Sequence, residues 1–124
     1  MTSLQLNIDI APTLLEIGGA PPPKEIHGRS LVPLLRGEKV LWRDSFLIEY
    51  FSDKVFPRMS RMGYQAVRDL RWKYIHYVDL DGMDELYDLK TDPYEMNNLA
   101  ARSHAGDTLV QLRGKLQQLL DSSK

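Results

Sequence analysis

The sequence predicts an α+β fold, in which a small four-stranded antiparallel sheet is packed by a C-terminal helix and preceded by a helical or extended arm. Two changes in the spacing of apolar residues indicate this. Between residues 45 and 89, four segments with strand character are separated by short connections, which join antiparallel neighbours. Between residues 109 and 120, leucines recur at helical spacing. A chain of 124 residues can bury roughly two-thirds of its unfolded surface, enough for one core.

Residues 1–42 are predicted to form the arm. Residues 4–8 alternate between apolar and polar side chains, which suits a short strand or an extended segment. A short buried helix is predicted over 9–17, with Asp9 as its N-cap and Pro12 in its first turn. Two glycines and three prolines then prevent the helix from continuing. The apolar positions assigned to its buried face are Ile10, Ala11, Leu14, Leu15 and Ile17.

Four strands are predicted after the arm. The first, 45–51, is apolar on both faces apart from Glu49, which favours a central strand. Strands over Tyr64–Asp69 and 72–78 are separated by only two residues, which predicts a tight hairpin. An Asp-Gly turn signal precedes the last strand, 85–89.

The C-terminal segment predicts an amphipathic helix with a single leucine stripe. Gly114 costs about 1 kcal/mol relative to Ala, so this helix should depend on docking rather than on its own propensity. Such a stripe serves either as core or as a dimer seam, and packing against the sheet is the favoured interpretation. The stripe consists of Leu109, Leu112, Leu116, Leu119 and Leu120.

Composition argues against several functions. A net charge of −1 leaves no excess of cations to displace phosphate counterions, so no nucleic-acid partner is predicted. The absence of cysteine rules out thiol catalysis and cysteine-based zinc sites, and His27, His76 and His104 lack the spacing of metal ligands. No apolar run approaches the ~20 residues of a membrane span, and residues 1–10 lack the design of a signal peptide.

Two groups of acidic residues receive a structural interpretation. The D-L-D-G segment at 79–82 resembles part of a calcium loop but lacks the later ligands, which favours a hairpin turn. Asp88, Asp92 and Glu95 could form an acid pair for hydrolysis. Their setting at a strand end and in a turn favours hydrogen bonds to backbone amides instead.

Six motifs occur in order between residues 8 and 99: D-x-x-PTLL, GRSL-x-P-L-L, WRD, G-Y-x-A-V-R, W-K-Y-I and ELYDL-x-x-DPYE-x-NNL. In this combination the sequence resembles the C-terminal region of type I sulfatases, of the alkaline-phosphatase superfamily. The N-sulfoglucosamine sulfohydrolase-like branch, whose bacterial members act on sulfated glycans, is the most similar.

The resemblance implies a two-part enzyme that hydrolyses sulfuric esters. The larger N-terminal α/β part of such an enzyme holds a formylglycine, made from Cys or Ser in a C/S-x-P-x-R motif, and a Ca²⁺ ion. This chain contains no such motif and no adjacent Asp-Asp or Asp-Asn pair. We therefore assign it no catalytic residue, metal ligand or cofactor, and expect it to be inactive alone. Members of the family are often exported to the periplasm, secreted or lysosomal.

The resemblance also implies a division of roles within the chain. Residues 1–42 would form an arm and connector that normally packs on the missing catalytic domain, and residues 43–124 the C-terminal sheet-plus-helix subdomain. Loops of this subdomain contribute to the rim of the pocket that binds the sulfated carbohydrate. In this sequence that points to the segment between the first two strands. The predicted substrate-binding residues are Asp53, Lys54, Arg58, Arg61, Met62 and Tyr64.

A second hypothesis is a self-standing carbohydrate-binding or protein-interaction module. In such a module the arm should pack on the sheet. In a detached region, the apolar face of the arm helix and residues 31–35 would lack their partner and leave an exposed patch. Self-association of the chain would hide that patch, and polar replacement of the leucines at 14, 15, 34 and 35 should prevent it.

Overall fold

The computed structural model describes residues 3–52 and 56–123. The chain divides into two compact units, Met1–Arg43 and Asp44–Lys124. Within the described residues, no helix is both long enough and apolar enough to cross a membrane.

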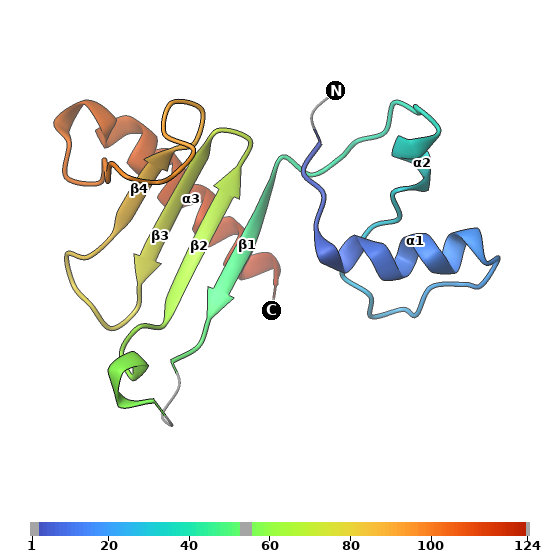
Figure 1. The fold of residues 1–124 in the computed structure, drawn as a ribbon, viewed down its shortest axis with the longest axis horizontal. Helices are drawn as coiled ribbons and strands as arrows, with labels where there is room; N and C mark the ends of the chain where they lie inside the picture. Colours follow the sequence, from blue (N-terminus) through green and yellow to red (C-terminus); the bar gives the residue numbers. More distant parts are fainter. Residues whose placement is uncertain (1–2, 53–55, 124) are drawn as a thin grey trace. The chain divides into compact units, whose positions relative to one another are not determined.

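The second unit is built on a four-stranded antiparallel sheet, which confirms the predicted architecture (Figure 1). The strands pair in sequence order, and the short β2–β3 and β3–β4 connections join antiparallel neighbours. They are β1 (Ser45–Tyr50), β2 (Tyr64–Asp69), β3 (Trp72–Tyr77) and β4 (Glu85–Asp88).

The prediction that the first strand is central was wrong, because β1 lies at one edge of the sheet. Its apolar residues on both faces reflect where side chains point, not how many neighbouring strands it has. Leu47 belongs to the face that carries the main core, whereas Ile48 packs with the cluster on the opposite face. An edge strand with two apolar faces therefore indicates that both faces of this sheet bury apolar side chains.

The helix α3 (Gly106–Ser122) covers one face of the sheet, as the leucine stripe predicted (Figure 1). Leu112 and Leu116 are almost completely buried, and they belong to one cluster with residues of β2, β3 and β4. The buried members of this cluster are Val67, Tyr74, Leu86, Ala105, Leu112 and Leu116. Burying a Leu side chain contributes roughly 1.5–3 kcal/mol, so this face is the main source of stability in the unit.

The opposite face of the sheet carries a smaller cluster formed by Ala66, Ile75 and Tyr87. Its partly buried apolar neighbours come from the strands themselves and from Leu89, just after β4. Figure 1 shows α3 on one side of the sheet, and no other α-helix among the described residues of this unit covers the opposite face.

The first unit contains a single-turn helix η1 (Asn7–Asp9), the helix α1 (Ile10–Ile17) and the short helix α2 (Val32–Leu35). The helix predicted over 9–17 is confirmed in its position but not in its burial. Pro12 and Thr13 are its buried residues. Most of the predicted apolar face is exposed, and the exposed fractions are 55% for Ile10, 63% for Leu14 and 68% for Ile17.

Candidate functional site

The ELYDL-x-x-DPYE-x-NNL segment forms β4 and the turn that follows it. Asn98 fastens this turn, because its Oδ1 accepts hydrogen bonds from the amides of Leu86 and Ala100 at 3.0 and 2.9 Å. Asp92 accepts from the amides of Met96 and Asn97 at 3.1 and 2.8 Å. The motif therefore closes a loop against β4.

The three acidic residues considered above as an acid pair have structural partners. Asp88 accepts two hydrogen bonds from the guanidinium of Arg71, at 3.0 and 2.7 Å, and one from the amide of Lys90. The Arg71 guanidinium is the main reason that the pKa of Asp88 is lowered. Glu95 pairs with Lys73 at 2.6 Å and has a positive φ of 56°. The amide-bonding interpretation is confirmed for Asp88 and Asp92, while Glu95 forms an ion pair.

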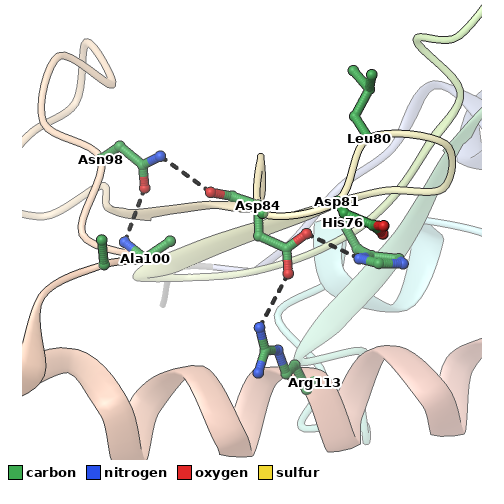
Figure 2. Close-up of a pocket in the computed structure, with 9 residues that line it drawn as sticks. His76, Leu80, Asp81, Asp84, Asn98, Ala100 and Arg113 are labelled. Carbon is green, nitrogen blue, oxygen red and sulfur yellow. Dashed lines mark hydrogen bonds and ion pairs between the residues drawn. The ribbon is translucent and has the colours of Figure 1, made fainter.

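A pocket of about 330 Å³ lies where the β3–β4 turn approaches α3, and Asp84 is its central charged residue (Figure 2). The Asp84 carboxylate accepts a hydrogen bond from the Tyr74 hydroxyl at 2.6 Å and lies 2.9 Å from His76 Nδ1. It also accepts from Arg113 of α3 at 3.1 Å. Burial would raise the pKa of Asp84, but these partners outweigh burial and lower it.

This cluster has a structural explanation. Arg113 donates to both Tyr74 and Asp84, so it ties α3 to the sheet. Burial and the nearby Asp84 raise the pKa of Tyr74, which keeps its hydroxyl protonated as a donor. Each oxygen of the Asp84 carboxylate has a partner inside the protein, so we assign no chemistry to it. No local sequence pattern indicates this contact, because Arg113 lies 29 residues from Asp84.

The predicted substrate-binding residues follow β1 in the chain, and the last of them, Tyr64, is the first residue of β2. Asp53 and Lys54 lie outside the described residues, so their placement stays a prediction. Arg58 is exposed on the single-turn helix η2 (Pro57–Met59), and Arg61 donates a hydrogen bond to the Asp79 carbonyl at 2.8 Å. Two of the set, Met62 and Tyr64, line one groove of about 220 Å³.

This groove is completed by residues that the sequence analysis missed: Tyr50, Met59 and Tyr77. Tyr50 pairs with Tyr64 across β1 and β2, and Tyr64 pairs with Tyr77 across β2 and β3. The register of the predicted strands could have placed the three tyrosines together, because directly opposed residues point to the same face of a sheet. The groove lies at the end of the sheet face that α3 does not cover.

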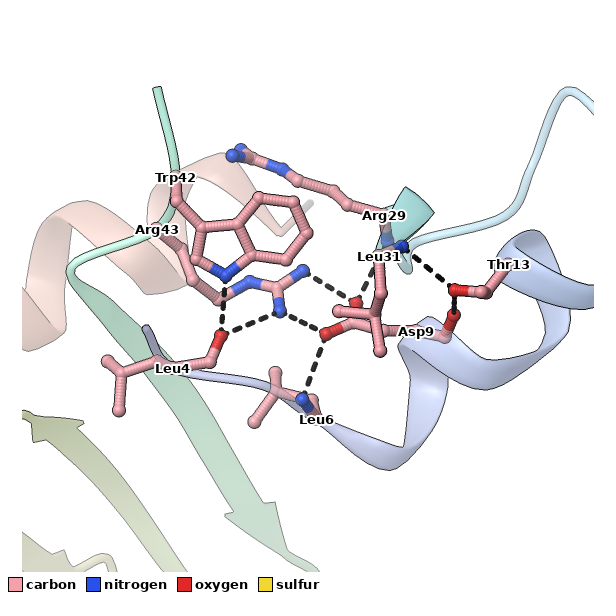
Figure 3. A network of polar contacts seen from close by, with 8 residues as sticks. All are labelled: Leu4, Leu6, Asp9, Thr13, Arg29, Leu31, Trp42 and Arg43. Atoms are coloured by element: carbon pink, nitrogen blue, oxygen red, sulfur yellow. Dashed lines mark hydrogen bonds and ion pairs between the residues drawn. The ribbon is translucent and has the colours of Figure 1, made fainter. Parts of the chain in front are cut away.

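In the first unit, Asp9 is completely buried and forms the centre of a polar network (Figure 3). Its two carboxylate oxygens bind the guanidinium of Arg43 and accept hydrogen bonds from the amides of Leu6 and Arg29, both at 2.9 Å. Burial alone would raise the pKa of Asp9, but these donors lower it to about 2. Asp9 stands at the N-cap position of α1, as predicted, but its carboxylate makes no hydrogen bond that caps this helix.

Three of the sequence motifs meet in this network. Thr13 donates to the Asp9 carbonyl at 2.5 Å and accepts from the amide of Leu31 at 2.9 Å. Gly28 allows the GRSL segment to approach, because a Cβ there would lie 1.9 Å from the carbonyl oxygen of Ile8. D-x-x-PT, GRSL and WRD therefore form one internal clasp, and we assign them no catalytic role.

No group of three or more His, Cys, Asp or Glu side chains within residues 3–52 and 56–123 is arranged to hold a metal ion. The described part of this chain therefore offers no residues that fit the Ca²⁺ implied for the larger part of a sulfatase.

Comparisons with known proteins identify the family. The family model described as "N-sulphoglucosamine sulphohydrolase, C-terminal" matches residues 1–122. The chain therefore belongs to this family, and the resemblance to the C-terminal region of sulfatases is confirmed.

Two curated relatives come from Bacteroides thetaiotaomicron. Delta 4,5-hexuronate-2-O-sulfatase is 35% identical over 97% of this chain, and N-acetylglucosamine-6-O-sulfatase is 32% identical over 99% of it. The chain spans 24% and 22% of their respective lengths.

Solved structures confirm the fold. A 2-O GAG sulfatase matches with a TM-score of 0.78 and 35% identity, over 93% of this chain and 24% of that one. The phosphonate monoester hydrolase of Agrobacterium radiobacter matches with a TM-score of 0.80 and 30% identity, over 98% of this chain and 26% of that one. The same fold thus occurs as part of enzymes named for two different reactions.

Proposed function

We propose that this chain acts as the C-terminal region of a larger sulfuric ester hydrolase that acts on sulfated glycans. It supplies packing and part of the rim of the substrate pocket, and it is inactive alone. The match of residues 1–122 to one family of sulfatase C-terminal regions carries this proposal. Relatives named for sulfated sugars, at 35% and 32% identity, support the substrate class.

The partner in this proposal is a sulfatase N-terminal domain. The exposed stripe on α1 supports it, because Ile10, Leu14 and Ile17 recur at i, i+4 and i+7, the spacing of a docking face. Contiguous exposed apolar surface of this kind typically marks an interaction site. The arm, residues 1–42, would pack on that domain through this stripe.

The rim in this proposal is the β1–β2 connection. Arg58 and Arg61 offer guanidinium groups, which suit bidentate contact with a sulfate or a uronate. Met62 and Tyr64 would contact the apolar side of the sugar. Asp53 and Lys54 complete the predicted set.

The catalytic groups would lie in the N-terminal domain. A formylglycine nucleophile and a Ca²⁺ ion would supply the attack on sulfur and the charge stabilisation there. No residue of this chain is assigned to either. The purified chain should therefore release no sulfate from aryl sulfates or sulfated sugars, with or without added Ca²⁺, and metal-dependent turnover by it would contradict the proposal.

A chimera tests the proposal directly. The matched region of the Bacteroides Delta 4,5-hexuronate-2-O-sulfatase would be replaced by this chain, and sulfate release from a 2-O-sulfated unsaturated hexuronate would be measured. We expect a folded, active chimera. Arg58→Ala and Arg61→Ala should raise its KM about tenfold with little change in kcat, because a hydrogen bond to a charged group is worth roughly 1.5–3 kcal/mol.

The same chimera tests the exposed apolar stripe of α1 as a docking face. Replacing Ile10, Leu14 and Ile17 by serine should abolish soluble assembly. Val110→Ser, at an exposed position of α3, should not. A chimera that folds but stays inactive, or one indifferent to the arm substitutions, would contradict the proposal.

A further inference from the structure

Three tyrosines form a continuous row across β1, β2 and β3, at the end of the sheet face that α3 leaves uncovered. The rings of Tyr50 and Tyr64 are stacked, with centroids 5.6 Å apart and an interplanar angle of 23°. Tyr64 and Tyr77 meet edge to face at 6.0 Å. Together with Met59 and Met62, the three tyrosines line the groove of about 220 Å³.

Hydrogen bonds to Glu85 of β4 hold the tyrosine row in place at its Tyr77 end. Glu85 accepts hydrogen bonds from the hydroxyls of Tyr77 at 3.0 Å and Tyr87 at 2.7 Å. Burial and the nearby Glu85 raise the pKa of both tyrosines, so both remain donors. The Tyr64 hydroxyl, in the middle of the row, has no hydrogen bond among the described residues. Among the described residues, the groove thus combines fixed aromatic rings with a tyrosine hydroxyl that has no hydrogen-bond partner there.

Positive charge lies on the segment that closes the groove. Arg58 and Arg61 flank Met59 along the chain, and neither forms a salt bridge with a carboxylate of the described residues. Arg61 uses one guanidinium nitrogen on the Asp79 carbonyl, which leaves other N–H donors available. Arg58 and Arg61 are the chain neighbours of Met59 and Met62, which line the groove. An aromatic groove whose lining residues adjoin guanidinium groups in the chain complements a ligand with an apolar ring face and an anionic substituent.

We propose that the row Tyr50–Tyr64–Tyr77 is a stacking platform for one sugar ring of a sulfated glycan, with Arg58 and Arg61 binding its sulfate. For the class of ligand this rests on the proposed function. The stacking role of Tyr50, Tyr77 and Met59 goes beyond the predicted rim. The aliphatic C–H face of a pyranose packs on tyrosine rings, and the hydroxyl of Tyr64 can bond to the sugar.

The size and chemistry of the groove favour a sugar over a protein element. A volume of about 220 Å³ falls below the 300–1,000 Å³ typical of pockets for drug-sized ligands, and it suits a single ring. Tyrosine carries an apolar body and a polar tip, which matches the alternating C–H and hydroxyl groups of a sugar.

The test uses the whole 124-residue chain and nuclear magnetic resonance titrations. The probes are a glucosamine-containing disaccharide with N- and 6-O-sulfates and the same disaccharide without sulfate. Protein concentrations are kept where light scattering gives a constant mass. We expect shifts at the three tyrosines, and tighter binding of the sulfated probe. Tyr64→Ala should raise the Kd about fivefold, whereas Tyr64→Phe should largely retain binding, because the ring remains.

Tyr94→Ala is the matched control, since Tyr94 is 84% exposed in the loop after β4. Arg61→Ala should reduce the preference for the sulfated probe without moving the shifts away from the tyrosines. The proposal is overturned if Tyr64→Ala binds like wild type, or if Tyr94→Ala weakens binding equally. It is also overturned if the tyrosine signals respond to protein concentration rather than to sugar, which would assign the row to a protein interface. An active chimera with an inert tyrosine row would refute the platform alone.

Discussion

The helices α1 and α3 are both amphipathic, yet their apolar stripes have opposite environments. In α3, Leu112 and Leu116 are 3% and 5% exposed, because the sheet of the same unit covers them. In α1, Ile10, Leu14 and Ile17 are each more than half exposed, and the buried residues are a proline and a threonine. A helical stripe thus indicates that a partner is needed, but it does not indicate where that partner comes from.

The two units also differ in what stabilises them. The Asp44–Lys124 unit has an apolar core between sheet and helix. The Met1–Arg43 unit is fastened by a buried carboxylate and its donors, with Val32 as its buried large apolar residue. A buried ion pair is weak evidence for net stability, although breaking it is costly. The first unit should therefore gain stability from a docking partner.

The largest expected effect is the loss of the α3 core. Leu116→Asp would place an unpaired charge among apolar neighbours and should destabilise the second unit by about 4 kcal/mol. Val110→Asp, on an exposed position of the same helix, should change the stability by less than about 0.5 kcal/mol. Thermal unfolding followed through the indole signal of Trp72 measures both. A small shift for Leu116→Asp would mean that the helix does not depend on the sheet.

Removing the carboxylate of the clasp should produce the next largest effect, confined to the first unit. Asp9→Ala leaves the Arg43 guanidinium without its partner and should cost about 3 kcal/mol. The indole signal of Trp42 is a direct reporter, because Trp42 Nε1 donates to the Leu4 carbonyl at 2.7 Å. The matched control is Asp44→Ala, since that carboxylate is 81% exposed in its contact with Lys115. Equal effects of the two variants would contradict the clasp.

The sheet could be predicted from the sequence because its determinants are local. A period of two and short turns define four strands, and the observed strands agree with them to within one residue at each end. The placement of β1 and the burial of α1 could not be predicted. Both depend on which surfaces other parts of the protein cover. The spacing of apolar residues shows which surfaces are apolar, but it does not show what covers them.

The polar contacts show the same division between local and distant determinants. Hydrogen bonds of Asp88 and Asp92 to amides a few residues away were predicted from the turn setting. Asp9 was correctly placed at the N-cap of α1, but its side-chain partners, which lie up to 34 residues away, were not predicted. In the candidate site, Met62 and Tyr64 were predicted. Tyr50 and Tyr77 were missed, because the rim was assigned to the connection and the flanking strands were not considered.

The stability of the first unit should depend on acidic pH. The pKa of Asp9 is lowered from 3.8 to about 2 on folding. A carboxylate with a depressed pKa stabilises the fold above its unfolded pKa, and this contribution disappears as the pH falls through its folded pKa. About 2 kcal/mol should therefore be lost between about pH 4 and pH 2. The Trp42 signal would follow this loss, and Asp9→Asn should remove the dependence in this window.

The smallest effect on stability should accompany a clear change in association. Ile10, Leu14 and Ile17 form the exposed stripe of α1, so their replacement by serine should change the free energy of unfolding by less than about 1 kcal/mol. The isolated chain should self-associate through this stripe, since a symmetric contact hides apolar surface from water. The triple variant should then be a monomer by light scattering, with both tryptophan signals unchanged. Polar replacement of the leucines at 14, 15, 34 and 35 would be less selective, because Leu15 and Leu34 are half-buried. Val110→Ser should leave the association as it is. If the wild-type chain stays monomeric at high concentration, the α1 stripe is not a docking face that lacks its partner. That result would favour a self-standing module.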